Sequence, residues 1–216
     1  VLTGLSLSVP TRSRFALLGP NGAGKSTLLR ILCNLLAPKR GQVLVLGCSL
    51  PAQFDQVKAK LGYLPDNPPL YEQFSPMEHF DLIATLWGLP QAIVRERAEE
   101  YLHLLGLWHE RNTWVERFSK GMRRKVALIS VLVRRPPLLL LDEPLDGLDP
   151  ESTDVAIELL RNYSREGTVL FTSHNQYLVD ALADHAGILA NGRIQWVGLY
   201  RPGQMDTHPV GKDVTG

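Results

Sequence analysis

A glycine-rich stretch between an apolar run and an amphipathic segment constrains this chain more than any other feature. Residues 19–27 read GPNGAGKST, which has the form G-x-x-x-x-G-K-[ST]. The preceding residues, 14–18, form a short, bounded apolar run that is typical of a buried strand. After the loop, apolar residues recur at helical spacing: Leu28, Leu29, Ile31, Leu32 and Leu35. Strand, loop and helix in this order favour a phosphate-binding loop over an ordinary glycine-rich turn.

The residue types in this loop indicate how it would bind phosphate. Glycines allow positive φ angles and a close backbone approach, so that successive N–H groups form a nest for an anion. The helix that follows adds the positive end of its dipole. Lys25 would place its ammonium on the β- and γ-phosphates, and Ser26 would offer a hydroxyl to Mg²⁺. The expected phosphate-contacting set is Gly19, Pro20, Asn21, Gly22, Ala23, Gly24, Lys25, Ser26 and Thr27.

A second set of polar residues follows the apolar run at 138–141. Asp142 and Glu143 end a segment that reads as a buried strand, where a charge is costly unless a ligand or a metal uses it. At the carboxyl end of a strand in an open α/β sheet, such residues face the ligand crevice. Asp142 is expected to support Mg²⁺, and Glu143 to polarise a water for attack on the γ-phosphate. The alternative is a strand-end aspartate that caps the next turn.

Two more stretches bear on the same chemistry. Residues 118–122 read FSKGM at an expected helix start, with Ser119 as the cap, so a serine, a glycine and a helix N-terminus together form an anion site. His174 follows the expected strand at 168–172 and places an imidazole near the crevice.

The order of the expected elements predicts one α/β domain over residues 1–216. A mainly parallel core would comprise residues 1–65 and 134–200, with antiparallel strands near the N-terminus; residues 1–10 alternate like a strand, and 41–47 form another. Residues 66–133 hold no convincing strand, and amphipathic helices are expected at 76–87 and 91–105. This middle part reads as an inserted helical subdomain. Residues 201–216 are expected to be a mobile tail, and the absence of an initial Met suggests a trimmed start.

Composition narrows the classes of function. The net charge of the 216 residues is +1, so nucleic acid is not the expected partner, and the basic residues at 123–125 are expected on a solvated helix face. Cys33 and Cys48 show no metal spacing and are expected to be free thiols, with Cys48 in a turn. No apolar run approaches the roughly 20 residues of a membrane span.

Taken together, these motifs resemble the nucleotide-binding domain of ATP-binding cassette (ABC) transporters. The order is that of the family: Walker A (GPNGAGKS), a γ-phosphate sensor loop, a signature motif, Walker B (LLLLDE), a D-loop (GLDP) and a histidine in TSH. The resemblance covers nearly all of residues 1–197 and implies a P-loop NTPase core. It also implies that ATP and Mg²⁺ are the cofactors.

The resemblance also implies roles for residues. Lys25, Glu143 and His174 would be catalytic, with Glu143 as the base and His174 orienting the attacking water. Ser119 and Gly121 would contact the γ-phosphate bound by a second copy of the chain, and Asp149 would lie at the seam between the copies. The implied metal-supporting residues are Ser26, Asp142 and Asp66.

The chain departs from the family pattern in three places. The signature is FSKGM instead of LSGGQ, a variant that resembles exporter-type ATPases, and Lys120 would add a positive charge facing phosphate. Asp66 stands where the sensor loop usually carries Gln, and an ionised Asp can hold Mg²⁺-bound water without donating a hydrogen bond. The aromatic residue that usually stacks on adenine does not precede Val1, and Phe15 is expected in the core.

The function implied by the resemblance is ATP hydrolysis that powers transport through a separate membrane permease. The chain would work as a nucleotide-sandwich dimer, cytoplasmic and peripheral on the inner face of the cell membrane. Two alternatives remain at this point: a soluble ABC-type ATPase of repair or translation, and a regulatory nucleotide-binding module.

Overall fold

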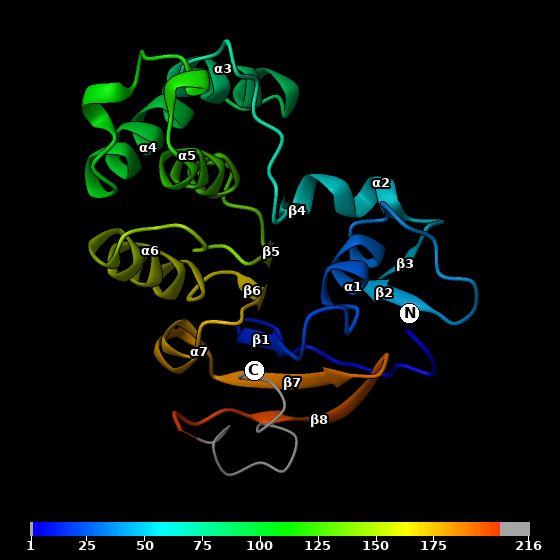
Figure 1. The fold of residues 1–216 in the computed structure, drawn as a ribbon. Helices are drawn as coiled ribbons and strands as arrows, with labels where there is room; N and C mark the ends of the chain where they lie inside the picture. The colour runs from blue at the N-terminus through cyan, green and yellow to red at the C-terminus, as the bar shows by residue number, and fades with distance from the viewer. Residues whose placement is uncertain (1, 204–216) are drawn as a thin grey trace.

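Short apolar runs form the central sheet of the computed structural model, which describes residues 2–203 (Figure 1). The sheet has six strands in the order β4-β5-β6-β1-β7-β8. Neighbouring strands are parallel from β4 to β7, and β8 closes the sheet antiparallel to β7. In sheet order the strands are Leu61–Leu64, Leu138–Asp142, Thr168–Thr172, Arg14–Leu18, His185–Ala190 and Arg193–Leu199.

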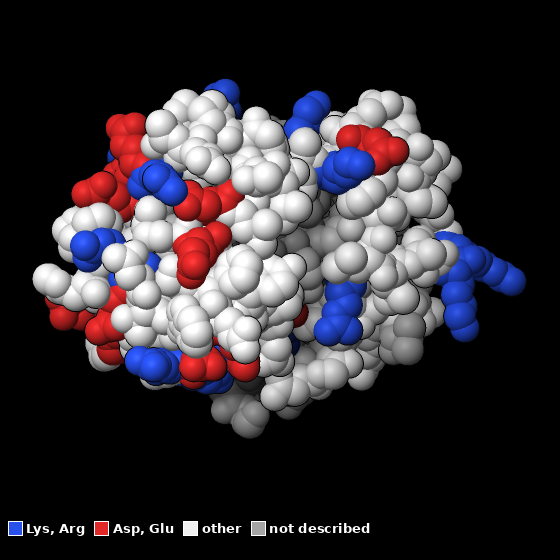
Figure 2. All heavy atoms as spheres, turned by 90° about the horizontal axis from the view of Figure 1, so that it is seen from above, with Lys and Arg blue, Asp and Glu red and all other residues white. Residues whose placement is uncertain are grey.

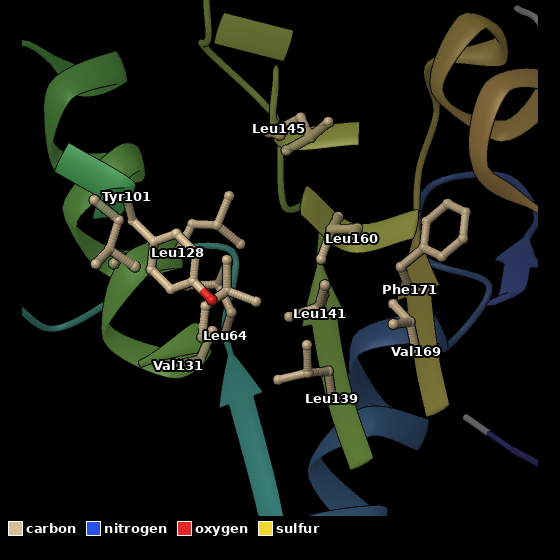
Figure 3. Close-up of a cluster of buried hydrophobic side chains, with 14 of the residues drawn as sticks. Leu64, Tyr101, Leu128, Val131, Leu139, Leu141, Leu145, Leu160, Val169 and Phe171 are labelled. Atoms are coloured by element: carbon tan, nitrogen blue, oxygen red, sulfur yellow. The ribbon is translucent and has the colours of Figure 1, made fainter. Parts of the chain in front are cut away.

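The inner positions of the central strands are apolar because both faces of the sheet are covered. Successive side chains of a strand point to opposite faces. Phe15 and Leu17 of β1 accordingly belong to one hydrophobic cluster, whereas Ala16 and Leu18 belong to the other. On the second face, Figure 3 shows Leu139, Leu141, Val169 and Phe171 of β5 and β6 beside residues of the helices. Phe15 is fully buried, which confirms its expected place in the core.

Helices flank this sheet on two sides (Figure 1). On one side lie α1 (Lys25–Leu32) and α2 (Phe54–Val57), the latter continued by a 3₁₀ turn at Lys58–Lys60. On the other lie α6 (Pro150–Tyr163) and α7 (Gln176–Leu182). The fold is therefore of the expected α/β class, with a mainly parallel sheet.

A group of helices lies beyond the β4 edge of the sheet (Figure 1). It consists of α3 (Pro76–Leu86), α4 (Gln91–Leu104), α5 (Lys120–Leu132) and 3₁₀ turns at Trp108–Glu110 and Val115–Arg117. Within the described residues, no strand occurs between Leu64 and Leu138, as expected. The start of α3 is fixed by a capping box, in which the Ser75 hydroxyl accepts from the Glu78 N–H and the Glu78 carboxylate accepts from the Ser75 N–H.

Two local predictions near the N-terminus are wrong. Residues 2–10 form no strand: the Thr3 N–H donates to the Gly192 carbonyl at 2.8 Å, but no neighbouring strand offers them a ladder. The antiparallel pair in this part of the chain is β2 (Val43–Val45), which lies within the expected strand at 41–47, with β3 (Cys48–Leu50). Cys48 therefore begins a strand and does not lie in a turn. Alternation alone did not reveal that residues 2–10 lack a partner.

The last two strands of the sheet form a hairpin. β7 and β8 pair antiparallel across Asn191 and Gly192, which have φ of 50° and 73°. These positive angles fit the turn that Asn-Gly favours. Residues 204–216, most of the expected mobile tail, lie outside the described residues. Within residues 2–203, no helix has the length and apolar character required to cross a bilayer.

The packing of β5 leads to a stability prediction. Leu139 is fully buried, so Leu139→Ala should lower the free energy of unfolding by about 2–5 kcal/mol through lost burial and a residual cavity. Leu199→Ala is the matched control because that side chain is 67% exposed, and its effect should stay within about 0.5 kcal/mol. Urea unfolding followed by circular dichroism measures both; equal effects would contradict the placement of β5 in the core.

Candidate functional site

The glycine-rich loop joins β1 to α1 and has the conformation that its glycines permit. Gly19 has φ of 147°, and a Cβ there would lie 2.0 Å from the carbonyl oxygen of Leu189. Gly24 caps α1 with φ of 108° and makes no side-chain cap bond. Because the first N–H groups of a helix have no partner within the helix, this helix start can bind an anion.

Lys25 lies in the first turn of α1 and closes back over the loop. Its ammonium donates to the carbonyls of Gly19 at 2.6 Å and Pro20 at 3.2 Å. The side chain is 8% exposed, and burial lowers the pKa of its ammonium, while the charges of Glu143 and Asp142 counteract that shift. A buried cation that faces two carboxylates can neutralise the phosphates of a nucleotide.

The carboxyl ends of β5 and β6 meet at the same point. Parallel pairing places Asp142 opposite Thr172. The Thr172 hydroxyl donates to Asp142 Oδ1 at 2.7 Å and accepts from the Glu143 N–H at 3.0 Å. Asp142 is buried, so this hydroxyl supplies a hydrogen bond that the buried carboxylate requires.

Glu143 leaves β5 in a strained backbone conformation. Its φ is 48°, which is uncommon for a residue with a side chain. The carboxylate is 17% exposed and lies 3.0 Å from His174 Nδ1, and it also accepts from the His174 N–H at 3.2 Å. The structure thus brings the two residues of the expected catalytic pair into direct contact.

One cavity of about 240 Å³ collects most of the sequence-predicted residues. It combines the phosphate-binding loop with acidic side chains from the ends of β4 and β5. The lining residues are Asn21, Gly22, Ala23, Gly24, Lys25, Ser26, Thr27, Asp66, Asp142 and Glu143.

The oxygen donors in this cavity fit Mg²⁺. Ser26, Asp66 and Asp142 offer hard hydroxyl and carboxylate oxygens, which this ion prefers. In the part of the chain that the structure describes, no three His, Cys, Asp or Glu residues gather into a metal cage. Mg²⁺ keeps several waters and is commonly bound through one or two carboxylates plus substrate phosphates, so a full cage is not required.

Ser119, Gly121 and Asp149 do not line this cavity. Ser119 caps α5 by accepting from the Met122 N–H at 3.2 Å, as expected. Gly121 faces the segment after β5, where an added Cβ would lie 2.6 Å from the carbonyl oxygen of Gly147. Asp149 caps α6 by accepting from the Ser152 N–H at 2.8 Å.

The side chain of Lys120 has a partner within its own chain. Its ammonium lies 2.5 Å from Asp146, and this pair helps to hold the pKa of the Asp146 carboxyl below its usual value. Within a single chain the Lys120 ammonium thus faces Asp146, and its expected position facing the phosphate of a second copy stays a prediction. Sequence reasoning did not identify Asp146, which lies 26 positions further along the chain.

Two other residues of the site were missed. Thr172 ends the expected strand before His174, and no motif indicates that it joins Asp142 to Glu143. The basic residues at 123–125 predict a solvated face, but the Arg124 side chain is 3% exposed, so that prediction is wrong for Arg124. Arg124, Leu128 and Val131 recur at helical spacing, and this pattern indicates the buried face of α5.

Comparisons with known proteins agree with this geometry. Residues 2–146 match the family described as ABC transporter. The chain is 34% identical over 215 residues to the Nod factor export ATP-binding protein I of Ralstonia nicotianae, covering 99% of this chain and 66% of that protein. It is 33% identical over 199 residues to the linearmycin resistance ATP-binding protein LnrL of Bacillus subtilis, covering 92% and 64%.

A solved structure described as the ATP binding subunit of an ABC transporter superposes with a TM-score of 0.86 at 32% identity, covering 92% of this chain and 83% of that one. The chain therefore belongs to the ABC transporter family and is an ATPase domain of that family. It spans less than two thirds of the length of the two curated relatives named above.

The double role of Thr172 can be tested with a change that preserves its shape. Thr172→Val removes the hydroxyl shared by Asp142 and the Glu143 N–H, so each group left unsatisfied should lower the free energy of unfolding by about 1–3 kcal/mol. Turnover of ATP should fall as well, because the two acidic residues lose their shared anchor. Thr168→Val is the control, since its hydroxyl accepts from the Arg12 N–H at 2.8 Å, away from the cavity. Urea unfolding and steady-state ATPase rates measure both; equal rates for the two variants would contradict the role of Thr172.

Proposed function

We propose that this chain hydrolyses MgATP to power transport through a separate membrane permease. The observation that carries the proposal is the shared cavity, in which the phosphate-binding loop faces Asp142 and Glu143. Phosphoryl transfer depends mainly on positioning and on neutralising charge, and both are available at this place.

The contacts support the following roles. Lys25 and the backbone N–H groups of residues 21–27 hold the phosphates, while Ser26 and Asp142 support Mg²⁺, with Asp66 contributing through water. Glu143 accepts a proton from the attacking water, and His174, 3.0 Å from the Glu143 carboxylate, orients this water and the γ-phosphate. A Mg²⁺ ion held by Ser26 and Asp142 would offset the negative charge of the phosphates.

A second copy of the chain completes the site in this proposal. Ser119 and Gly121 lie outside the cavity of their own chain, at the exposed N-terminus of α5, where N–H groups and a hydroxyl are available to an anion. Closure of two copies would bring these groups to the ATP held by the partner, with Asp149 at the seam. Hydrolysis is then tied to a large motion.

The motion would reach the membrane subunit through the loop at residues 66–72 and the helical subdomain at about 66–133. Two relatives carry export or resistance in their names, which supports an exporter that works at the inner face of the cell membrane. The cargo would be selected by the permease.

The competing functions receive less support. A repair or translation ATPase would act on nucleic acid, but the face in Figure 2 mixes acidic and basic side chains with large neutral areas. A regulatory module without catalysis does not require Glu143 and His174 to be in contact beside the cavity.

The first test of this proposal removes the phosphate-binding cation. Lys25→Ala should abolish detectable MgATP binding, because the buried ammonium is the positive side chain that lines the cavity. Titration with a fluorescent ATP analogue measures binding, and circular dichroism verifies the fold. Lys39→Ala is the control, since Lys39 is an exposed lysine outside the cavity, and this variant should bind ATP like the wild type. Undiminished binding by Lys25→Ala would contradict the site.

The second test separates binding from hydrolysis. Glu143→Gln should keep ATP affinity but lower kcat by about 10²–10⁴-fold, because the amide cannot accept the proton of the water. Trapped ATP should then favour a dimer, which light scattering with and without MgATP detects. Hydrolysis at the wild-type rate by Glu143→Gln would contradict the assignment of Glu143 as the base. A variant that stays monomeric with MgATP would contradict the dimer.

A further inference from the structure

A buried guanidinium lies beside the site, at the junction between the helical group and the sheet. Arg124 belongs to α5, but its side chain reaches the ends of two strands of the core. Nη1 donates to the Pro65 carbonyl at 3.0 Å, and Nη2 donates to the Glu143 carbonyl at 2.8 Å. The same Nη2 lies 3.4 Å from the carboxylate of Asp66. One side chain thus contacts both acidic segments of the cavity.

The contacted groups lie where the chain leaves the sheet. Pro65 and Asp66 directly follow β4 and begin the connection to the helical group, whereas Glu143 directly follows β5. Because β4 and β5 are parallel neighbours, their carboxyl ends lie side by side. From α5, the planar guanidinium of Arg124 bridges these two ends with separate N–H donors. A lysine ammonium cannot reproduce this geometry.

The contact with Glu143 falls on the strained residue. A non-glycine residue with φ of 48° persists only when its surroundings hold it. Its N–H is held by Thr172 and its carbonyl by Arg124, with the Asp146 N–H as a second donor at 3.2 Å. The direction of the Glu143 carboxylate therefore depends on contacts from β6, from α5 and from the turn that follows.

Stability alone does not account for a guanidinium at this place. Burial disfavours the charge, and its pKa is lowered for that reason in spite of four nearby carboxylates. The Asp66 carboxylate is 52% exposed, and an ion pair that is open to water contributes little to stability. The contacts instead concern the placement of the two acidic segments.

We propose that Arg124 is a positioning residue for ATP hydrolysis, one that holds the Asp66 segment and the Glu143 backbone in register with α5. The inference rests on the proposed roles of Asp66 and Glu143. Since α5 begins at Lys120, directly after Ser119, the same helix carries the groups proposed to meet the partner's ATP. Arg124 follows Ser119 by only about 7.5 Å along the helix axis, so a tilt of α5 is passed to Glu143 by a short, direct route.

The test compares Arg124→Met and Arg124→Lys with Arg117→Met in the full chain. Arg117 is an exposed arginine in the same group of helices, outside the cavity lining. Steady-state ATP turnover gives kcat and KM, and a fluorescent ATP analogue gives affinity. For Arg124→Met we expect kcat to fall by about 10–100-fold because the catalytic groups are misplaced. KM for MgATP should change by less than about threefold, because the phosphate-binding loop is untouched. Arg124→Lys should recover only part of kcat, and Arg117→Met should match the wild type.

A double variant tests the connection to Asp66. If Arg124 acts partly through this carboxylate, the effects of Arg124→Met and Asp66→Asn overlap. The double variant should then retain at least about threefold more of the wild-type kcat than the product of the fractions that the two single variants retain. Independent, multiplicative losses would contradict the connection.

Three results would overturn the inference: wild-type kcat in Arg124→Met, an increase in KM with kcat unchanged, or full activity in Arg124→Lys. The lysine variant decides the matter if Arg124→Met does not fold by circular dichroism. A wild-type protein without Mg²⁺-dependent hydrolysis would instead contradict the proposed function.

In that case, amide hydrogen exchange tests the positioning role of Arg124 without reference to hydrolysis. Residues 66–72 and 143–149 should exchange faster in Arg124→Met than in Arg117→Met, and equal exchange would refute this role.

Discussion

The hydrogen bond between Thr172 and Asp142 is the contact on which the site depends. It exists because β5 and β6 are parallel and paired in a register that sets these residues opposite each other. A carboxylate at the end of a buried strand would otherwise lack a partner, and leaving a buried charge without hydrogen bonds is costly. The same hydroxyl accepts a hydrogen bond from the Glu143 N–H. One threonine therefore fixes both the end of β5 and the backbone conformation of the residue that follows.

The buried charges of the site are mutually dependent. Burial lowers the pKa of the Lys25 ammonium, and the charges of Glu143 and Asp142 partly offset that shift. In this structure the Lys25 ammonium is satisfied by two carbonyls of its own loop. Phosphate oxygens would be stronger acceptors than these carbonyls, because hydrogen bonds between ionised groups exceed those to neutral ones. Lys25 can therefore exchange the carbonyls of its loop for phosphate oxygens when a nucleotide binds.

The sequence predicted those parts of the fold and the site that depend on local pattern. Strands β5 and β6 have the predicted bounds, and the glycine loop, Asp142, Glu143 and Asp66 line one cavity as the motifs indicate. The misses depend on which distant segments meet. Thr172 acts through strand register, Lys120 is held by Asp146, and Arg124 contacts residues up to 59 positions away. Residues 2–10 alternate like a strand, but a strand also needs a neighbour, and alternation does not encode one.

The helical group packs on the sheet through apolar side chains, and Arg124 adds a polar link between them beside the site. The chain passes between them after β4 and again before β5, whereas α5 carries Ser119 and Gly121 at one end. A rigid helix transmits a displacement of its first turn to every side chain along it. Because Arg124 donates to the Glu143 carbonyl, a change in the angle of α5 would act directly on the residue proposed to accept a proton from the attacking water. An ATPase built in this way can retain nucleotide while its hydrolytic residues respond to the position of the helical group.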